Sequence, residues 1–261
     1  MAYQVRQLSF GEILDQSFKV LKDNFIVLTS TMALVYVPYT MLMAQFVPTA
    51  PAGVPQQPSM GVVLPAMLGA LVMLTVMPLS QLAVTRAVSE AYLNVPLTLT
   101  EAYRTALKSY VPYIGTCLLL GLSVLGLMLL LVVPAIYFGI AWALVGPVAV
   151  VEGIFGGAAM KRSRALTKGY WWRTFGVLVL AGLITGVVSA GVSAVLGAIP
   201  LLGPALNGVV QSIAAAYTAV ALVVLYVDLR CRHEDFDLQL LANQVAKRAP
   251  VADAPAVSAG I

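Results

Sequence analysis

Three long segments of the sequence contain no Asp, Glu, Lys, Arg or His: residues 24–85, 109–151 and 174–227. A membrane-spanning helix needs about 20 apolar residues, so each segment is long enough for two spans and a connection. Only 10% of the chain is charged and 60% is hydrophobic, whereas soluble domains carry about 25% charged residues. We therefore predict an all-α polytopic membrane protein with six transmembrane helices.

Apolar runs and prolines divide these segments into individual spans. The predicted spans are residues 25–46, 61–84, 111–133, 135–151, 174–197 and 205–227. Residues 48–60 contain four prolines and no charge, which is typical of an external loop. Pro38, Pro78 and Pro147 lie inside spans and are expected to kink or interrupt them.

The basic residues indicate the orientation. All fifteen Lys and Arg lie in residues 1–23, 86–108, 161–173 and 230–248, which share one side of the membrane if there are six spans. The positive-inside rule makes that side cytoplasmic. We therefore expect both termini in the cytoplasm. As a separate expectation, we predict no nucleic-acid partner.

A charge pattern recurs before each pair of spans. Charges with the spacing 0, 3, 7 stand at Glu12, Asp15 and Lys19, at Glu101, Arg104 and Lys108, and at Lys161, Arg164 and Lys168. On a helix such positions form one stripe. The opposite stripes are Phe10, Leu14, Phe18, Leu21 and Phe25; Leu99, Tyr103, Leu107, Tyr110 and Ile114; and Phe155, Ala159, Ser163, Leu166 and Tyr170. Ser9 with Glu12 and Thr98 with Glu101 predict capping boxes at two of the helix starts.

These patterns predict a threefold repeat of a cytoplasmic amphipathic interfacial helix followed by a transmembrane hairpin. The units are about 9–85, 98–151 and 155–229 within a single membrane domain, residues 1–248. The alternative is that any short helix at a membrane interface acquires such a pattern. A C-terminal cytoplasmic helix is predicted for 235–248, capped by Asp235 or Asp237. An Ala/Pro-rich disordered tail is predicted for 249–261.

The most basic segment ends in aromatic residues where the fifth span begins. Lys and Arg favour an anionic cytoplasmic leaflet, and Tyr and Trp favour the headgroup level. We interpret the segment as a membrane-surface anchor; the alternative is a site for an anionic lipid headgroup or a phosphodiester. The residues of this predicted lipid interface are Lys161, Arg162, Arg164, Lys168, Tyr170, Trp171, Trp172 and Arg173.

The predicted spans contain no Asp, Glu, Lys, Arg or His, which argues against a proton-coupled pump, a voltage sensor or a carboxylate-based intramembrane enzyme. Two sets of residues stand out there. Small residues at four-residue intervals in the fifth span predict close helix packing, favoured within the chain over packing between copies: Gly182, Gly186, Ala190 and Ala194. A polar path is the hypothesis for Gln45, Gln81, Asn207 and Gln211.

No catalytic motif is present: GxSxG, HExxH, the P-loop and the Rossmann glycine pattern are all missing. The single histidine, His233, is expected at the surface, and no disulfide is expected between Cys117 and Cys231. We predict no metal site, no cofactor and no catalytic residue.

Four segments resemble a bacterial family of six-span proteins related to the membrane domain of glycerophosphoryl diester phosphodiesterases. They are LSFGEILDQSFKVLKDNF (8–25), GPVAVVEG (146–153), RSRALTKGYWWRTFGVLVL (162–180) and DLRCRHEDFDLQLLA (228–242). The resemblance implies a bacterial cytoplasmic (inner) membrane. It does not imply phosphodiesterase activity, because no segment outside the spans approaches the roughly 250 residues of a TIM barrel.

The favoured function is a non-enzymatic membrane scaffold or accessory subunit that binds anionic phospholipid, a partner membrane protein or a second copy of the chain. One alternative is a transporter or channel for a lipid-like or small neutral solute, with a polar lining on facing helices. Another is a phospholipid-handling enzyme with a headgroup pocket at Lys161, Arg162, Arg164 and Trp171.

Overall fold

The computed structural model describes residues 3, 5–46, 60–92, 98–196 and 202–236, and in these residues it contains helices and no strand. The predicted all-α class is confirmed. The helices are α1 (Phe10–Asp23), α2 (Phe25–Phe46), α3 (Met60–Tyr92), α4 (Leu99–Lys108), α5 (Tyr110–Leu130), α6 (Val132–Ala141), α7 (Val145–Val151), α8 (Gly156–Thr167), α9 (Trp171–Leu196) and α10 (Leu202–Glu234).

Six segments are long and apolar enough to cross a membrane, as predicted from the charge-free segments. They are Phe25–Gln45, Val63–Tyr92, Tyr110–Leu130, Val132–Val151, Trp171–Leu196 and Leu202–Glu234. Two helices extend further at their C-terminal ends than predicted, because polar side chains four residues apart pair along them. Arg86 pairs with Glu90 in α3, and Arg230 pairs with Glu234 in α10.

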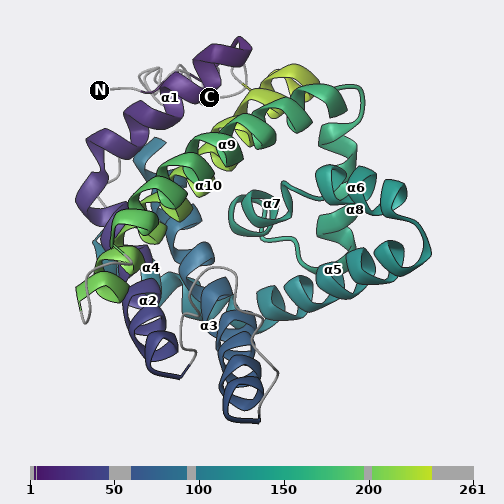
Figure 1. Cartoon of the computed structure of the whole chain (residues 1–261). Helices are drawn as coiled ribbons and strands as arrows, with labels where there is room; N and C mark the ends of the chain where they lie inside the picture. The colour runs from purple at the N-terminus through teal and green to yellow at the C-terminus, as the bar shows by residue number, and fades with distance from the viewer. Residues whose placement is uncertain (1–2, 4, 47–59, 93–97, 197–201, 237–261) are drawn as a thin grey trace, which may run out of the picture.

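Helix α10 is the most extensively packed helix in the described part of the chain. It packs along α2 and α9 and also contacts α1 and α3 (Figure 1). Many of its residues between Ala216 and Cys231 are buried, including Tyr226 and Leu229. Helix α8 contacts both α6 and α7 (Figure 1).

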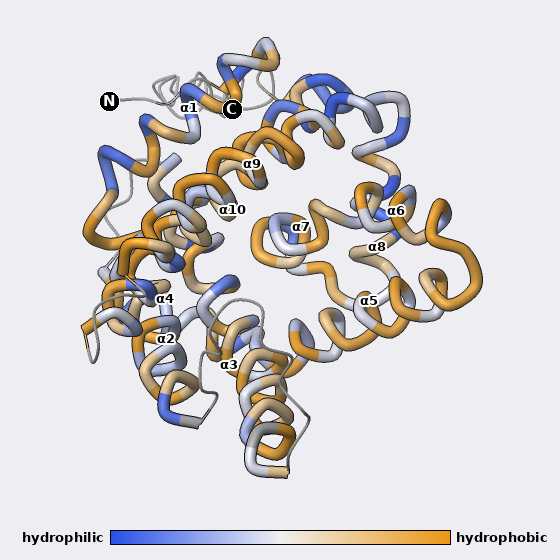
Figure 2. Tube along the Cα trace, in the orientation of Figure 1, coloured by the Kyte–Doolittle hydropathy of each residue, from blue (hydrophilic) through white to orange (hydrophobic). Residues whose placement is uncertain are grey.

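The long helices consist mainly of apolar residues, as Figure 2 shows by their mostly orange colour. Few residues of α5 and α9 are buried, and Leu129 and Leu130 are 82% and 79% exposed. Such extensive apolar exposure is unfavourable in water, and it is what lipid-facing helices require. The chain is therefore a membrane protein.

The two predicted capping boxes are confirmed. Ser9 Oγ accepts from the Glu12 backbone N–H at 3.4 Å, and Glu12 Oε2 accepts from the Ser9 N–H at 2.6 Å. This second bond and the Arg6 guanidinium hold the pKa of Glu12 down to about 2. Thr98 and Glu101 repeat the arrangement at α4. Two of the three amphipathic helices therefore begin as predicted.

The predicted apolar stripe of α1 coincides only in part with the face that packs against the rest of the chain, since Phe10 packs against the core and Leu21 is buried. The buried side chains are Ile13, Gln16, Ser17, Val20 and Leu21, whereas Phe18 of the stripe is 62% exposed. Gln16 donates to the Tyr92 hydroxyl at 2.7 Å, and the Ser17 hydroxyl donates to the Ile13 carbonyl. Because they are hydrogen-bonded in this way, polar groups can occupy the packed face, and the exposed part of the stripe, such as Phe18, remains available to the membrane.

The fourth span is interrupted between α6 and α7, and Pro147 explains the position of this break. A proline ring clashes with the carbonyl four residues earlier, and residues 142–144 between α6 and α7 are not α-helical. Pro147 therefore falls in the first turn of α7, where its missing N–H costs nothing. Pro38 and Pro78, in contrast, lie inside continuous helices.

The C-terminal predictions mostly lie outside the described residues. The helix predicted for 235–248 is described only to residue 236, and the tail 249–261 is not described. Asp235 follows the end of α10 with a left-handed φ of 47°, whereas an N-cap residue is usually extended. A cap at Asp235 is therefore not seen.

Candidate functional site

The basic segment divides into exposed and paired cations. Lys161, Arg164 and Lys168 are exposed, and none of them forms an ion pair with the part of the chain that the structure describes. Arg164 lies over the Phe138 ring at 5.2 Å from its centroid. Arg162 and Arg173 are only partly exposed, and both bind carboxylates. The predicted lipid interface is therefore not one continuous set of free cations.

Arg162 belongs to an ion-pair network at the C-terminal end of α10. Its Nε lies 2.8 Å from Glu152 Oε2, and its Nη1 lies 2.5 Å from Glu234 Oε1. The Tyr226 hydroxyl also donates to Glu152 at 2.8 Å, and Arg230 pairs with Glu234. Glu234 and Glu152 raise the pKa of Arg162 above its ordinary value. A phosphate at Arg162 would have to compete with two carboxylates, so this residue is a poor headgroup ligand.

A second network is built on Asp228, whose side chain is 0% exposed. Its Oδ2 lies 3.0 Å from both Arg173 Nε and Arg232 Nε, and its Oδ1 accepts from the Leu8 backbone N–H at 2.8 Å. Both arginines also donate to the Leu8 carbonyl at 2.6 Å. Arg173 therefore joins α9, α10 and the segment before α1, which is a structural task rather than lipid binding.

The aromatic residues at the start of α9 have different surroundings. Trp171 donates its indole N–H to the Tyr137 carbonyl at 3.2 Å and stacks between the rings of Tyr137 and Phe175. Tyr170 meets His233 edge-on, and His233 is exposed as predicted. Trp172 is 76% exposed. Of the two tryptophans here, Trp172 is the one free to enter the headgroup region.

Helix α8 also supplies hydrogen-bond partners to the backbone where the fourth span is interrupted. The Ser163 hydroxyl, 0% exposed, donates to the Ala141 carbonyl at 2.8 Å and accepts from the Leu144 N–H at 3.2 Å. Thr167 donates to the same carbonyl at 3.3 Å. Unpaired backbone groups at membrane depth are costly and persist only where protein covers them. The buried face of α8 therefore serves the fold, and its exposed face carries the free cations.

The small residues of the fifth span face outward. Gly182, Gly186, Ala190 and Ala194 are all exposed, and no atom of another element lies within 4 Å of a Cβ built on Gly182 or Gly186. The favoured interpretation, close packing within the chain, is therefore wrong at these glycines. Packing against a second copy stays a prediction.

The four polar span residues are dispersed over α2, α3 and α10. Gln45 is exposed, whereas Gln81, Asn207 and Gln211 are half-buried. Asn207 accepts a hydrogen bond from the Ser193 hydroxyl at 2.8 Å, which links α9 to α10. None of the four lines either of the two clefts described below. A polar path through them stays a prediction.

A cleft of about 520 Å³ lies between α1, α9 and α10. Its lining is almost entirely apolar: Leu14, Phe18 and Leu21 from α1; Ile184, Val188 and Val192 from α9; and Val210, Ile213 and Ala214 from α10. The remaining lining residues are Asp15, Thr185 and Tyr217. A cavity of this size and character falls within the range of small-molecule sites.

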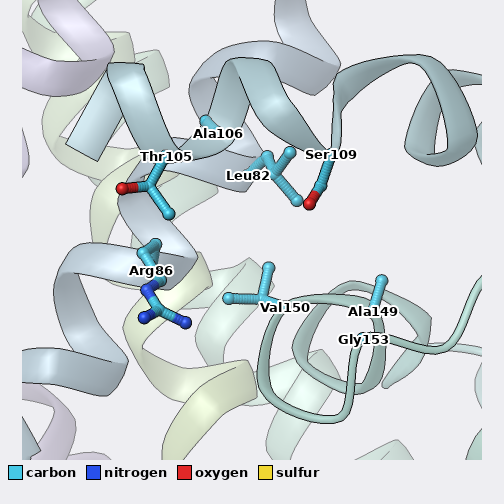
Figure 3. Close-up of a pocket in the computed structure, with 8 residues that line it drawn as sticks. All are labelled: Leu82, Arg86, Thr105, Ala106, Ser109, Ala149, Val150 and Gly153. Atoms are coloured by element: carbon cyan, nitrogen blue, oxygen red, sulfur yellow. The ribbon is translucent and has the colours of Figure 1, made fainter. Parts of the chain in front are cut away.

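A second, much smaller pocket of about 70 Å³ lies between α3, α4 and α7 (Figure 3). Its lining includes Arg86, whose Nε donates to Glu90 at 2.6 Å, and Val150. A water molecule takes up about 30 Å³ of liquid, so the pocket has room for little more than water. The larger cleft is the better candidate for a binding site.

The acidic partners in these two ion-pair networks were not predicted from the sequence. A signal was present, because two of the charge-free segments end immediately before Glu152 and Asp228. A carboxylate at the end of a span is expensive to bury unless a cation pairs with it. Glu152 and Asp228 therefore each required a nearby arginine as an ion-pair partner. In the part of the chain that the structure describes, no group of His, Cys, Asp and Glu could hold a metal ion.

Comparison with known proteins yields one match. A family model described as Domain of unknown function (DUF8558) matches residues 104–246, which is more than half of the chain. The match begins inside α4 and includes α5 to α10. No curated protein and no solved structure matches the chain significantly. The resemblance to the membrane domain of glycerophosphoryl diester phosphodiesterases is not tested by these comparisons and stays a prediction.

Proposed function

The chain belongs to the DUF8558 family, a domain of unknown function, and we propose from its geometry that it is a non-enzymatic membrane scaffold that binds phospholipid. The observation that carries this proposal is the apolar cleft between α1, α9 and α10. Its walls come from an amphipathic helix and two spans, so a lipid could enter it without leaving the bilayer.

The physical basis of binding is packing rather than expulsion of water. Lipid tails are as apolar as the side chains of a span, so association within the bilayer depends on van der Waals fit and on polar contacts. Ile184, Val188 and Val192 form one wall of the cleft and Ile213 lies on another. An acyl chain lying between these walls would have protein contacts that a flat helix surface does not offer.

The exposed cations of α8 support a second contact with lipid. Lys161, Arg164 and Lys168 are exposed, and Trp172 follows them at the start of α9. Each basic residue near an anionic leaflet contributes about 1 kcal/mol, so three give about 3 kcal/mol at low salt. This face serves as the membrane-surface anchor, with anionic phospholipid as its partner. Arg162 and Arg173 are excluded from that role by their carboxylates.

The proposed location is the bacterial cytoplasmic membrane, with both termini in the cytoplasm. The exposed cations of α1, α4 and α8 all precede a pair of candidate spans in the same way, which supports one common side for them. The positive-inside rule assigns that side to the cytoplasm.

The scaffold proposal is tested by native mass spectrometry of the protein extracted mildly from its membrane. Val188→Trp should fill part of the cleft and reduce retained phospholipid at least fivefold, because the added ring occupies the space of the acyl chain. The matched control is Val187→Trp, the neighbouring residue on α9, which does not line the cleft and is 71% exposed. Equal lipid retention in both variants, each folded, would contradict the cleft as the binding site.

A further inference from the structure

The polar groups of the cleft define what kind of lipid head it would accept. Asp15 is the only charged residue among those that line it. Its carboxylate is exposed and forms no ion pair within the described part of the chain. A free carboxylate beside an apolar wall is a stable arrangement only where a cation or water can reach it. The cleft therefore has an anionic end and an apolar body.

Tyr217 supplies a second, independent observation. Its side chain is 6% exposed and lines the same cleft. No described residue forms a hydrogen bond with its hydroxyl, although buried tyrosine hydroxyls usually have a partner. The other hydroxyl of the lining, on Thr185, already donates to the Ala181 carbonyl at 2.8 Å. The Tyr217 hydroxyl therefore remains available to a ligand as donor or acceptor.

We propose that the cleft binds a phospholipid whose head carries a primary ammonium group, with Asp15 as the ligand of the ammonium and Tyr217 as a hydrogen-bond partner. This inference rests on the proposed function and names its lipid class. A primary ammonium has N–H donors that a carboxylate can accept, whereas a quaternary ammonium has none. An anionic head would be repelled by Asp15.

Lys19 is suited to bind the phosphate of such a headgroup. It lies one helical turn after Asp15 on the same face of α1, where side chains four residues apart are neighbours. Lys19 is exposed and forms no ion pair with another described residue. The pair therefore offers a negative and a positive group side by side, complementary to the ammonium and phosphate of a zwitterionic head.

The test is lipid competition on the full chain. The protein is reconstituted in vesicles containing equal amounts of phosphatidylethanolamine, phosphatidylcholine and phosphatidylglycerol with identical acyl chains, then extracted and weighed by native mass spectrometry. We expect phosphatidylethanolamine to be retained about tenfold over each of the others, the size of one charge-assisted hydrogen bond. Asp15→Asn should abolish this preference while leaving a lipid bound.

The control variant is Asp235→Asn, an exposed carboxylate outside the cleft, where a left-handed backbone tolerates Asn. It should keep the preference. A wild-type protein that retains the three lipids equally, or prefers phosphatidylglycerol, overturns the headgroup assignment but leaves the scaffold proposal standing. A preference that survives Asp15→Asn overturns the role of Asp15. Loss of all lipid from the wild type would instead overturn the proposed function. A bound polypeptide that is released by Asp15→Asn would overturn the lipid assignment and show that the cleft binds a partner chain.

Discussion

At the residue scale, the side chain of Asp228 joins the segment before α1 to α9 and to the C-terminal end of α10. It is 0% exposed, and it binds Arg173, Arg232 and the Leu8 backbone. A buried carboxylate is tolerated only when charges and hydrogen bonds compensate its desolvation. Here two guanidinium groups and one amide do so, and the arginines are in turn satisfied by the Leu8 carbonyl.

Replacing Asp228 by Asn should destabilise the protein by about 3 kcal/mol, because it leaves Arg173 and Arg232 without a counter-charge in a partly buried site. The measurement is unfolding in mixed micelles as the fraction of dodecyl sulfate is raised. The matched control is Glu90→Gln, which removes the carboxylate of the more exposed Arg86–Glu90 pair and should cost about 1 kcal/mol or less. Equal losses in the two variants would show that the Asp228 network is worth no more than a surface pair.

The residue scale is also where sequence-based prediction was weakest. The basic segment was correctly located, but which cations are free depends on carboxylates far away in the sequence. Arg162 is paired with Glu234, which is 72 residues later, whereas Lys161 beside it is exposed. Spacing on one helix cannot reveal such partners. Likewise, the cleft depends on how α1 crosses α9 and α10, and no local pattern indicates that crossing.

At the element scale, the spans were predictable because length and polarity control them directly. A charge-free run must be covered by lipid or protein, and only a helix satisfies its own backbone there. The interruption of the fourth span was predicted from Pro147. The hydrogen bonds from α8 to the backbone at this interruption were not predicted. Ser163 was assigned to an amphipathic stripe and Thr167 to no role, and only the structure shows both hydroxyls bonded to the Ala141 carbonyl.

Ser163→Ala should therefore cost about 2 kcal/mol of unfolding free energy, since it leaves the Leu144 N–H without its partner in a buried site. The control is Ser123→Ala on α5, an exposed serine whose hydroxyl donates only to Leu119 of its own helix. That change should stay within about 0.5 kcal/mol. Thermal unfolding in detergent gives both values. A Ser163→Ala protein as stable as Ser123→Ala would mean that water or relaxation replaces the lost bonds.

At the scale of the whole molecule, the C-terminal end of α10 is where the three predicted units meet. Asp228 binds the Leu8 backbone before the first hairpin, and Tyr226 binds Glu152 after the second. Glu234 binds Arg162 on the helix that precedes the third. The helix order follows the predicted scheme, with α1, α4 and α8 each preceding a pair of spans. A helix that contacts all three predicted units is what we expect if they form one domain, as predicted, rather than three independent hairpins.

This arrangement predicts a single orientation for all the exposed cations. Single reporters Lys19→Cys, Lys108→Cys and Lys168→Cys should react with a membrane-impermeant maleimide only when the cytoplasmic side is opened. Met60→Cys, 84% exposed at the start of α3, should react from the outside. The parent protein is the control, because Cys117 is half-buried in a span and Cys231 is buried. If Lys168→Cys reacted from the same side as Met60→Cys, an odd number of the candidate spans between these two residues would fail to cross the membrane. The six-span topology would then be wrong, and so would the cytoplasmic anchor that depends on it.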